Sequence, residues 1–176
     1  MTITIRPARP SDLRRVAAVE DAGAAMYVEH FGDRTAPALT ARAPSGAERD
    51  GHGFLLVAAD ERRLVGFAHV VPHDLVAHLQ QLSVLPAYGR RGTGTRLVRA
   101  AMEEARWAGY DRMSLCTYRD VPWNGPFYAR LGFAEVDPAR LEPFQRDLRA
   151  AERALGLDEP GPRVVMDRRL ERLTDR

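Results

Sequence analysis

The sequence predicts a mixed α/β fold built on one twisted sheet of six or seven strands, and three observations support this. The elements run as a strand, then helices, then several strands in succession, then helices and strands in alternation. Helical segments follow strands near residues 84–97 and 118–122, which favours parallel pairing in that part of the sheet. The chain has 176 residues, of which 45% are hydrophobic, and no linker-like stretch divides it. We therefore expect a single domain over residues 1–176 with one core.

The first half of the chain predicts a strand, a long helix and a hairpin. Residues 2–6 alternate β-branched and polar side chains, as a strand does. Pro10-Ser11-Asp12 begins a helical pattern that continues through residues 13–31. Residues 33–52 are rich in Pro, Gly, Ala and charge, which predicts either a short helix or an ordered loop. The apolar runs at 54–60 and 64–71 flank a turn at Glu61-Arg62-Arg63 and predict an antiparallel pair.

The second half predicts alternating strands and helices. Residues 76–84 alternate and form the fourth expected strand, which Pro86 ends. Apolar residues then recur at helical spacing after a glycine-rich run, up to Gly109. Strands are expected at 111–118, 133–136 and 163–170, and helices at 122–131 and 138–155, the last broken by Pro160-Gly161-Pro162.

Composition excludes several classes of protein. One cysteine, Cys116, leaves no disulfide framework within the chain and suits a reducing compartment. The N-terminus lacks the apolar run of a signal peptide, and no segment approaches the roughly 20 apolar residues of a membrane span. A net charge of +2 does not argue for nucleic acid. We expect a cytoplasmic protein with neither nucleic acid nor membrane as a partner.

A glycine-rich loop between the fourth strand and the next helix is the first candidate binding site. It reads Gly89, Arg90, Arg91, Gly92, Thr93, Gly94, Thr95. Glycines let the backbone approach a ligand, and the unpaired N–H groups of a helix N-terminus bind phosphate. A plain strand–helix turn is the alternative. A dinucleotide fold needs a third glycine and a nucleoside-triphosphate loop needs a GK[ST] ending, and both are absent here.

Two stretches of the chain resemble the central motifs of the GNAT superfamily of acyl-CoA-dependent N-acyltransferases. LSVLPAYGRRGTGTRLV resembles the family's CoA pyrophosphate motif, [QR]xxGx[GA], and WNGPFYARLGF resembles its FYxxxGF motif. The resemblance covers residues 76–133 and implies helices on both faces of the sheet, splayed fourth and fifth strands, and acetyl-CoA as co-substrate. Gly89 departs from the family, which usually has Gln or Arg there. Either Arg90 or Arg91 supplies the missing donor, or the phosphates rest on backbone amides alone and CoA binding is weaker.

The resemblance also implies which residues hold the donor. The thioester would lie along the backbone amides of Leu82, Ser83 and Val84, with Val84 as the oxyanion donor, unless all three pair in the sheet. Asn124 would hydrogen-bond the pantetheine, or else cap the helix that follows it. Arg130 would reach the adenosine 3′-phosphate, or else be solvated. The expected CoA-binding set is Leu82, Ser83, Val84, Gly89, Arg90, Arg91, Gly92, Thr93, Gly94, Thr95, Asn124, Phe127, Tyr128 and Arg130.

Two side chains are candidates for proton transfer. Tyr128 matches the tyrosine that often protonates the leaving sulfur in this family. A phenol can donate a proton to a thiolate formed beside it, and a tyrosine that only packs at a helix end is the alternative. His78 is the candidate general base, as histidine suits neutral pH, although a lone strand histidine is often structural. Gln80 replaces the second histidine of arylalkylamine N-acetyltransferases, and His69 is a weaker alternative base. Cys116 is expected to be a buried residue without a nucleophilic role, and no metal site is expected.

The function expected is therefore transfer of an acetyl group from acetyl-CoA to a primary amine by direct attack. The acceptor classes left open are a small amine, polyamine, aminoglycoside, amino acid or protein N-terminus, and a homodimer is also open. A non-catalytic acyl-CoA-binding regulator of the same fold is the alternative, favoured by Gly89, whereas His78 and Tyr128 together favour an enzyme.

Overall fold

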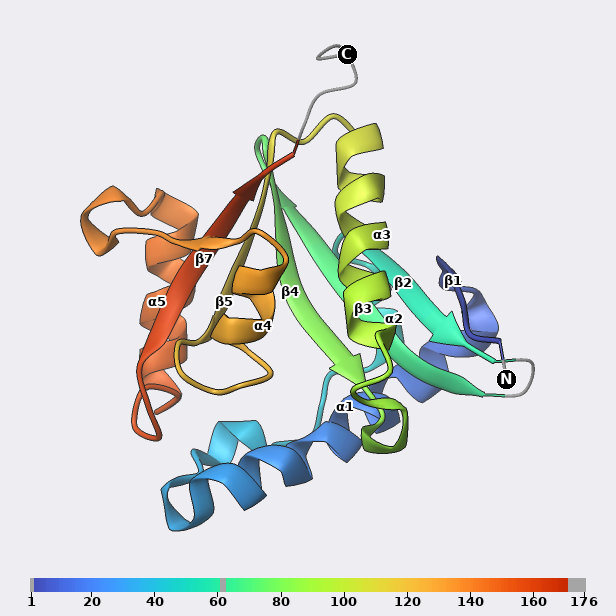
Figure 1. The fold of residues 1–176 in the computed structure, drawn as a ribbon, viewed down its shortest axis with the longest axis horizontal. Coiled ribbons are helices and arrows are strands. Elements are labelled where there is room, and N and C mark those ends of the chain that lie inside the picture. The colour runs from blue at the N-terminus through green and yellow to red at the C-terminus, as the bar shows by residue number, and fades with distance from the viewer. Residues whose placement is uncertain (1, 61–62, 171–176) are drawn as a thin grey trace.

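One seven-stranded sheet organises the protein, in the strand order β1-β2-β3-β4-β5-β7-β6. The computed structural model describes residues 2–60 and 63–170. Neighbouring strands are antiparallel except β4 and β5, which are parallel. The mixed α/β fold class predicted from the sequence is confirmed, and Figure 1 shows the sheet with helices packed against it.

The strands and helices have the following bounds. The strands are β1 Thr4–Pro7, β2 Phe54–Ala59, β3 Leu64–His73, β4 Val76–Val84, β5 Arg112–Tyr118, β6 Ala134–Glu135 and β7 Arg163–Arg169. The helices are α1 Pro10–Phe31, α2 Gly46–Asp50, α3 Thr93–Trp107, α4 Gly125–Arg130 and α5 Pro143–Ala154. Short 3₁₀ turns lie at Gly32–Arg34, Pro37–Leu39, Pro86–Tyr88 and Pro138–Arg140.

Helices cover both faces of the sheet because side chains alternate along each strand. On one face, Leu97, Val98 and Ala101 of α3 and Tyr128 of α4 are buried in one apolar cluster with alternate residues of β2 to β5 and β7. On the other face, Val16 of α1 packs with residues of β2 and β3. The helical spacing read from the sequence of α3 therefore marks its buried side.

Several predicted elements differ in extent from the observed ones. The helix expected at 138–155 begins at Pro143, because Glu142 and Gln145 form a capping box there and Pro138–Arg140 is a separate 3₁₀ turn. The strand expected at 133–136 is reduced to Ala134–Glu135. Residues 33–52 hold two 3₁₀ turns and α2. The predicted turn at 61–63 lies partly outside the described residues.

The prediction of parallel pairing is correct for one crossover and wrong for the other. The connection from β4 through α3 to β5 ends in a parallel pair. The connection from β5 through α4 leads to β6, which does not pair with β5 because β7 lies between them and is antiparallel to both. Among the described helices, none is long and apolar enough to cross a membrane.

Candidate functional site

β4 and β5 are paired over a short stretch and then separate. The parallel register joins Val76 to Arg112, Ala77 to Met113 and His78 to Ser114. Beyond this point β4 continues to Val84 and β5 to Tyr118 with no further pairing between their described residues. Figure 1 shows the two strands together near the top of the view and apart at its lower end. The splay that the resemblance implied is therefore present, and it leaves one edge of β4 open.

A β-bulge in β4 lies close to the point of separation. His69 of β3 is opposite Gln81 and Val70 is opposite Leu79, so Gln80 is an extra residue without a partner across the ladder. An extra residue bends and twists the strand that carries it. The bulge begins two residues after His78, where it can direct the rest of β4 away from β5.

The open edge of β4 carries backbone amides. The N–H of Leu85 donates to the carbonyl of Val65 in β3 at 2.8 Å. Successive N–H groups of a strand point to opposite edges, so the Ser83 amide also faces β3, whereas those of Leu82 and Val84 face the opening. Of the three amides expected to meet a ligand, Leu82 and Val84 have this orientation.

The glycine-rich loop ends at an uncapped helix N-terminus. Gly92 is the N-cap of α3 in the left-handed region, at φ 79°, and provides no side-chain cap. Arg90 also has a positive φ, 55°, which is uncommon for a residue with a side chain. The first N–H groups of α3 are thus free to bind an anion, and the dipole of the 15-residue helix favours it. Arg91 is exposed beside them.

The backbone conformation at Gly89 does not require a glycine. Its φ of −66° and ψ of 162° are accessible to any residue. A Cβ there would lie 3.2 Å from the Pro86 carbonyl oxygen, a close contact that a small shift would relieve. The backbone would therefore admit the Gln or Arg that the resembled motif has at this position.

The start of α3 lies against α4. A Cβ on Gly94 would be 3.6 Å from the ring of Phe127, so the two helices approach closely at the loop. Thr93 is 2% exposed, and its hydroxyl oxygen has no hydrogen-bond partner among the described residues. Thr95 is half-buried on the same turn. Loop and helix α4 thus border one end of the opening between β4 and β5.

Helix α4 holds Tyr128 in an apolar environment. Gly125 is required at its start, since a Cβ there would lie 2.2 Å from the Arg119 carbonyl oxygen. The Tyr128 ring packs edge-on against Phe127 and Phe133. Burial raises the pKa of the Tyr128 phenol above its usual range, so the hydroxyl keeps its proton at neutral pH. A proton donor is the role that this side chain can fill.

Asn124 anchors α4 to the rest of the fold. It occupies the N-cap position, but its side chain does not cap the helix. Its Oδ1 accepts a hydrogen bond from the Thr117 hydroxyl at 2.9 Å, and its amide meets the Tyr27 hydroxyl of α1 at 3.2 Å. Tyr27 was not among the predicted site residues, because it is 97 residues away and carries no local signal. The contacts of Asn124 are those of a residue that positions α4.

His78 lies at the last β4–β5 pair, on the face opposite Tyr128. It is 2% exposed, and its Nδ1 is 3.3 Å from the Ser114 hydroxyl oxygen. The rings of His73 and Phe144 meet its ring edge-on. Burial, with a smaller effect from His73, lowers the pKa of His78 to about 3. The imidazole is therefore neutral at pH 7, and a proton would enter it only with strong compensation.

The buried imidazole predicts an acid-sensitive fold. In the unfolded chain His78 titrates near pH 6.5, and in the folded chain near 3, so its contribution to stability is complete above pH 6.5 and is lost as pH falls. Between pH 7 and 5 we expect the wild type to lose about 2 kcal/mol of unfolding free energy through this group. Urea denaturation at both pH values measures it. The loss should be smaller by about this amount in His78→Gln, where the contribution of His69 remains, and unchanged in His30→Gln. Equal losses in all three proteins would contradict the assignment.

His69, the weaker candidate base, takes part in a separate network of hydrogen bonds and an ion pair. Its Nε2 is 2.8 Å from the His52 carbonyl oxygen and its Nδ1 is 3.3 Å from Arg49, which also pairs with Glu20 of α1. Since Nε2 must donate to the carbonyl, Nδ1 accepts from the guanidinium. Burial lowers the pKa of His69, so the ring stays neutral. This network ties α1, α2 and β3 together.

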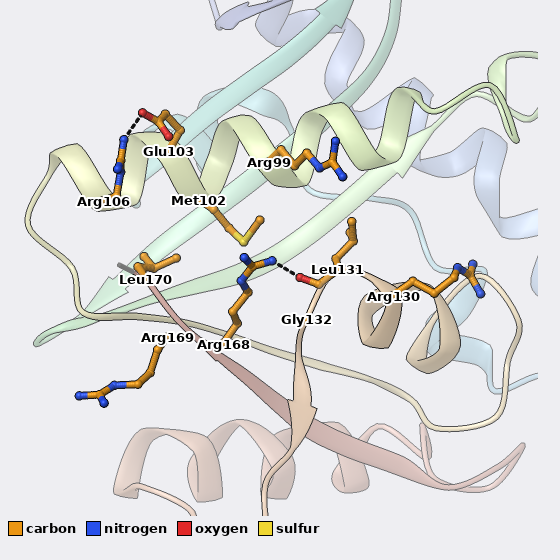
Figure 2. A pocket seen from close by; sticks show the side chains of 10 residues that line it. All are labelled: Arg99, Met102, Glu103, Arg106, Arg130, Leu131, Gly132, Arg168, Arg169 and Leu170. Carbon is orange, nitrogen blue, oxygen red and sulfur yellow. Dashed lines mark hydrogen bonds and ion pairs between the residues drawn. The ribbon is translucent and has the colours of Figure 1, made fainter. Parts of the chain in front are cut away.

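A cavity of about 600 Å³ lies between the second half of α3 and the chain after α4. Figure 2 shows Arg99 and Arg106 on α3, Arg130 at the end of α4, and Arg168 and Arg169 on β7 around it, with Met102, Leu131 and Leu170 forming apolar wall. Arg106 pairs with Glu103, and Arg168 donates to the Leu131 carbonyl. Arg99, Arg130 and Arg169 have no ion-pair partner among the described residues, so the cavity attracts anions.

Cys116 and the histidines offer little further chemistry. Burial raises the pKa of the Cys116 thiol to about 12, so it carries no thiolate at neutral pH. Among the described residues, no three His, Cys, Asp or Glu side chains are grouped so that they could hold a metal ion.

The chain is similar to known proteins in sequence and in fold. The family model described as "Acetyltransferase (GNAT) family" matches residues 17–133. A mycothiol acetyltransferase from Acidothermus cellulolyticus is 39% identical over 90 residues, which are 51% of this chain and 26% of that protein. The chain thus matches about a quarter of the length of this curated relative.

Solved structures share the fold at low sequence identity. The PaiA N-acetyltransferase from Thermoplasma acidophilum, in complex with coenzyme A, superposes with a TM-score of 0.68 at 17% identity, over 96% of this chain and 99% of that one. The ribosomal-protein-S18-alanine N-acetyltransferase from Escherichia coli gives 0.66 at 15% identity, over 99% and 97%. N-acetylglutamate synthase from Neisseria gonorrhoeae, complexed with coenzyme A and N-acetyl-glutamate, gives 0.67 at 19% identity, over 98% and 36%.

Proposed function

This chain belongs to the acetyltransferase (GNAT) family, and from that premise we propose that it transfers an acetyl group from acetyl-CoA to a primary amine. Membership places it among acyl-CoA-dependent acyltransferases. The donor, the acceptor class and the residues that act are proposals that rest on the geometry of this chain.

The observation that carries the proposal is the separation of β4 from β5 after the His78–Ser114 pair. It turns the amides of Leu82 and Val84 toward an opening that the uncapped end of α3 borders. Backbone donors that are fixed before reaction stabilise a developing oxyanion without reorganisation. An acyl thioester laid along β4 would therefore meet these donors at its carbonyl oxygen.

The rest of the donor would follow α3 and α4. The pyrophosphate would lie on the N-terminus of α3 with Arg90 and Arg91 beside it. Arg99 lies about 9 Å further along the helix axis, at the edge of the arginine-lined cavity, and Arg130 lies across from it. We assign these two guanidinium groups to the 3′-phosphate of the nucleotide.

The proposed reaction needs a base, an oxyanion donor and an acid. The amine nitrogen attacks the thioester carbon, the carbonyl oxygen becomes negative beside Val84, and His78 takes the proton released from nitrogen. The C–S bond then breaks, and Tyr128 gives its proton to the sulfur. Both side chains regain their starting protonation through solvent. No enzyme-bound acyl group is formed, which agrees with the raised pKa of the Cys116 thiol.

One observation favours the alternative of a non-catalytic acyl-CoA-binding regulator. The low pKa of His78, about 3, makes the unliganded imidazole a weak base. A cationic amine beside the ring or the exclusion of water would lower this pKa further, so catalysis by His78 requires a negative group that stabilises the imidazolium. The two functions therefore share the donor and differ in whether thiol is released when an amine is added.

Other features stay predictions from the sequence. These are one domain over residues 1–176, the cytoplasm as the site of action, and a small-molecule or peptide amine as acceptor, with a homodimer left open. The similar proteins act on acceptors that their names state. At the sequence identities given above, those acceptors are not assigned to this chain.

The test begins with calorimetric titration of acetyl-CoA. We expect micromolar binding, and roughly tenfold weaker binding for Arg91→Gln, because a charge-assisted hydrogen bond to phosphate contributes about 1.5–3 kcal/mol. Arg130→Gln should weaken acetyl-CoA but not dephospho-CoA. Arg14→Gln removes an exposed arginine of α1 and serves as the charge control. No binding by the folded wild type would refute the donor assignment.

Turnover then separates the enzyme from the regulator. Release of CoA thiol is followed with a panel of amines that represents each acceptor class named above. Binding without thiol release for every amine would favour the regulator, whereas release that depends on one amine class would name the acceptor.

A further inference from the structure

A buried polar network connects His78 to two strands and a helix. The Nε2 amide of Gln145, on α5, is 3.1 Å from the Ser114 hydroxyl oxygen and 3.1 Å from Oδ1 of Asp167 on β7. Ser114 and Asp167 are directly opposite each other in the register of β5 and β7, and the Ser114 hydroxyl beside the carboxylate works against the burial that raises the pKa of Asp167. Ser114 lies 3.3 Å from Nδ1 of His78. Ser114 is fully buried and Gln145 is 1% exposed, so these hydrogen bonds are shielded from bulk solvent.

The donors and acceptors of this network can be assigned from chemistry. The Gln145 amide nitrogen only donates, and an ionised Asp167 only accepts. Arg112 pairs with the other carboxylate oxygen of Asp167 at 3.0 Å. Ser114 has a single proton, and a carboxylate is a stronger acceptor than a neutral imidazole. The Ser114 hydroxyl therefore donates to Asp167, and its oxygen is left to accept from His78.

We infer that Asp167 acts through Ser114 to hold His78 in the tautomer that is protonated on Nδ1, which leaves Nε2 as the proton acceptor in acyl transfer. Asp167, Ser114 and Gln145 are positioning residues in this arrangement, because none of them meets the substrate. The inference rests on the proposed function in taking His78 as the base.

The same chain of hydrogen bonds offsets the cost of charging His78. When Nε2 takes the proton from the amine nitrogen, the ring becomes a cation that still donates from Nδ1 to Ser114. Ser114 continues to donate to the Asp167 carboxylate, so a negative group two hydrogen bonds away faces the new charge. Apart from the N–H bond that forms at Nε2 as the N–H bond of the amine breaks, no covalent bond to the protein forms or breaks. A carboxylate that fixes a tautomer and stabilises the imidazolium without being protonated is established in serine proteases.

Other charged groups near His78 set the conditions of the test. His73 of β3 faces its ring, as does the neutral Phe144 of α5. Arg112 of β5 joins Asp167 to Glu142, next to α5. Burial raises the pKa of Asp167. The network should be measured at pH 7.5, and again over the acid range where Asp167 takes up a proton and the direction of the Ser114 hydrogen bond can change.

The deciding experiment determines the tautomer of His78 by long-range ¹H–¹⁵N correlation of the imidazole in the full-length protein. His78→Gln identifies the signals, and the measurement needs no acceptor amine. We expect Nδ1–H in the wild type. Asp167→Asn should reverse the direction of these hydrogen bonds, because the new amide can donate to Ser114. Ser114 then donates to Nδ1 of His78, and the ring proton moves to Nε2. Ser114→Ala should remove the preference of His78 for the Nδ1–H tautomer.

Kinetic measurements distinguish positioning from packing. With the best amine of the panel at saturation, we expect kcat to fall roughly 100-fold in Asp167→Asn with KM within about threefold. Cys116→Ser, on the same face of β5 and outside the network, is the matched control and should keep both the tautomer and kcat. Thermal denaturation of each variant checks folding, so that a loss of structure is not read as a loss of catalysis.

Each remaining outcome decides the inference. Nε2–H in the wild type, or a tautomer unchanged in both Asp167→Asn and Ser114→Ala, overturns it while leaving the acyltransferase proposal intact. Full activity of His78→Gln overturns it through the base assignment, even with the expected tautomer. Failure of the folded wild type to bind acetyl-CoA refutes the proposed function and, with it, the role of His78 as a base, whatever the tautomer.

Discussion

Replacing Tyr128 with Phe is expected to lower kcat for acyl transfer roughly 100-fold or more and to leave the Kd for acetyl-CoA within about twofold. The ring keeps its packing against Phe127 and Phe133, so the helix and the donor site are preserved. The proton that the phenol would give to the departing thiolate is lost, and general acid catalysis contributes about 10²–10⁴-fold. Thiol release and calorimetry with the same preparation measure the two quantities.

The control for this variant is Tyr110→Phe. Tyr110 is half-buried beside the same apolar cluster but lies at the far end of α3. Its loss of a hydroxyl should change kcat by less than twofold. A Tyr128→Phe enzyme with kcat within about threefold of wild type would remove Tyr128 from the mechanism and leave protonation of the sulfur to solvent.

Replacing Arg49 with Met is expected to cost the largest amount of stability, about 3–5 kcal/mol, as is typical when one partner of a buried ion pair is removed. Arg49 is buried, pairs with Glu20, donates to His69 and lies over the Phe67 ring. Its loss leaves the Glu20 carboxylate largely buried without a counter-charge and the His69 ring without a donor. Urea denaturation at pH 7 measures the change in unfolding free energy.

A double-mutant cycle tests the cause. Glu20→Met in the Arg49→Met background removes the stranded carboxylate, so the double variant should recover part of the lost stability. Additive losses would show that the ion pair with Glu20 does not contribute and that Arg49 acts through its contacts with His69 and Phe67. Binding of acetyl-CoA should survive in any variant that remains folded, because the network lies on the face of the sheet away from α3.

Most of the features that the sequence predicted correctly depend on residues that are close together in the chain. The strand, loop and helix from Val76 to Trp107 were located from alternation, Pro86, glycine content and helical spacing, which are all local signals. The N-terminus of α3, which we propose binds the pyrophosphate, was located from the same stretch. The glycine-rich loop and Tyr128 were recognised because both motifs are short and continuous.

The features that the sequence did not predict depend on contacts between residues that are distant in the chain. The insertion of β7 between β5 and β6 depends on strand pairing across the sheet, for which the sequence of β6 gives no signal. Tyr27, Ser114, Gln145 and Asp167 look like ordinary polar residues of helices and strands. Their roles arise from contacts such as that of Ser114 with Gln145, 31 residues away.

The sequence by itself determined the fold class, the position of the phosphate loop and the presence of a tyrosine and a histidine suited to proton transfer. Only the tertiary structure decided their circumstances: which β4 amides are open, what anchors α4, and how deeply His78 is buried. The physical reason is that a motif specifies chemical groups, whereas pKa and hydrogen-bond direction depend on the dielectric environment and the partners that folding brings to each group.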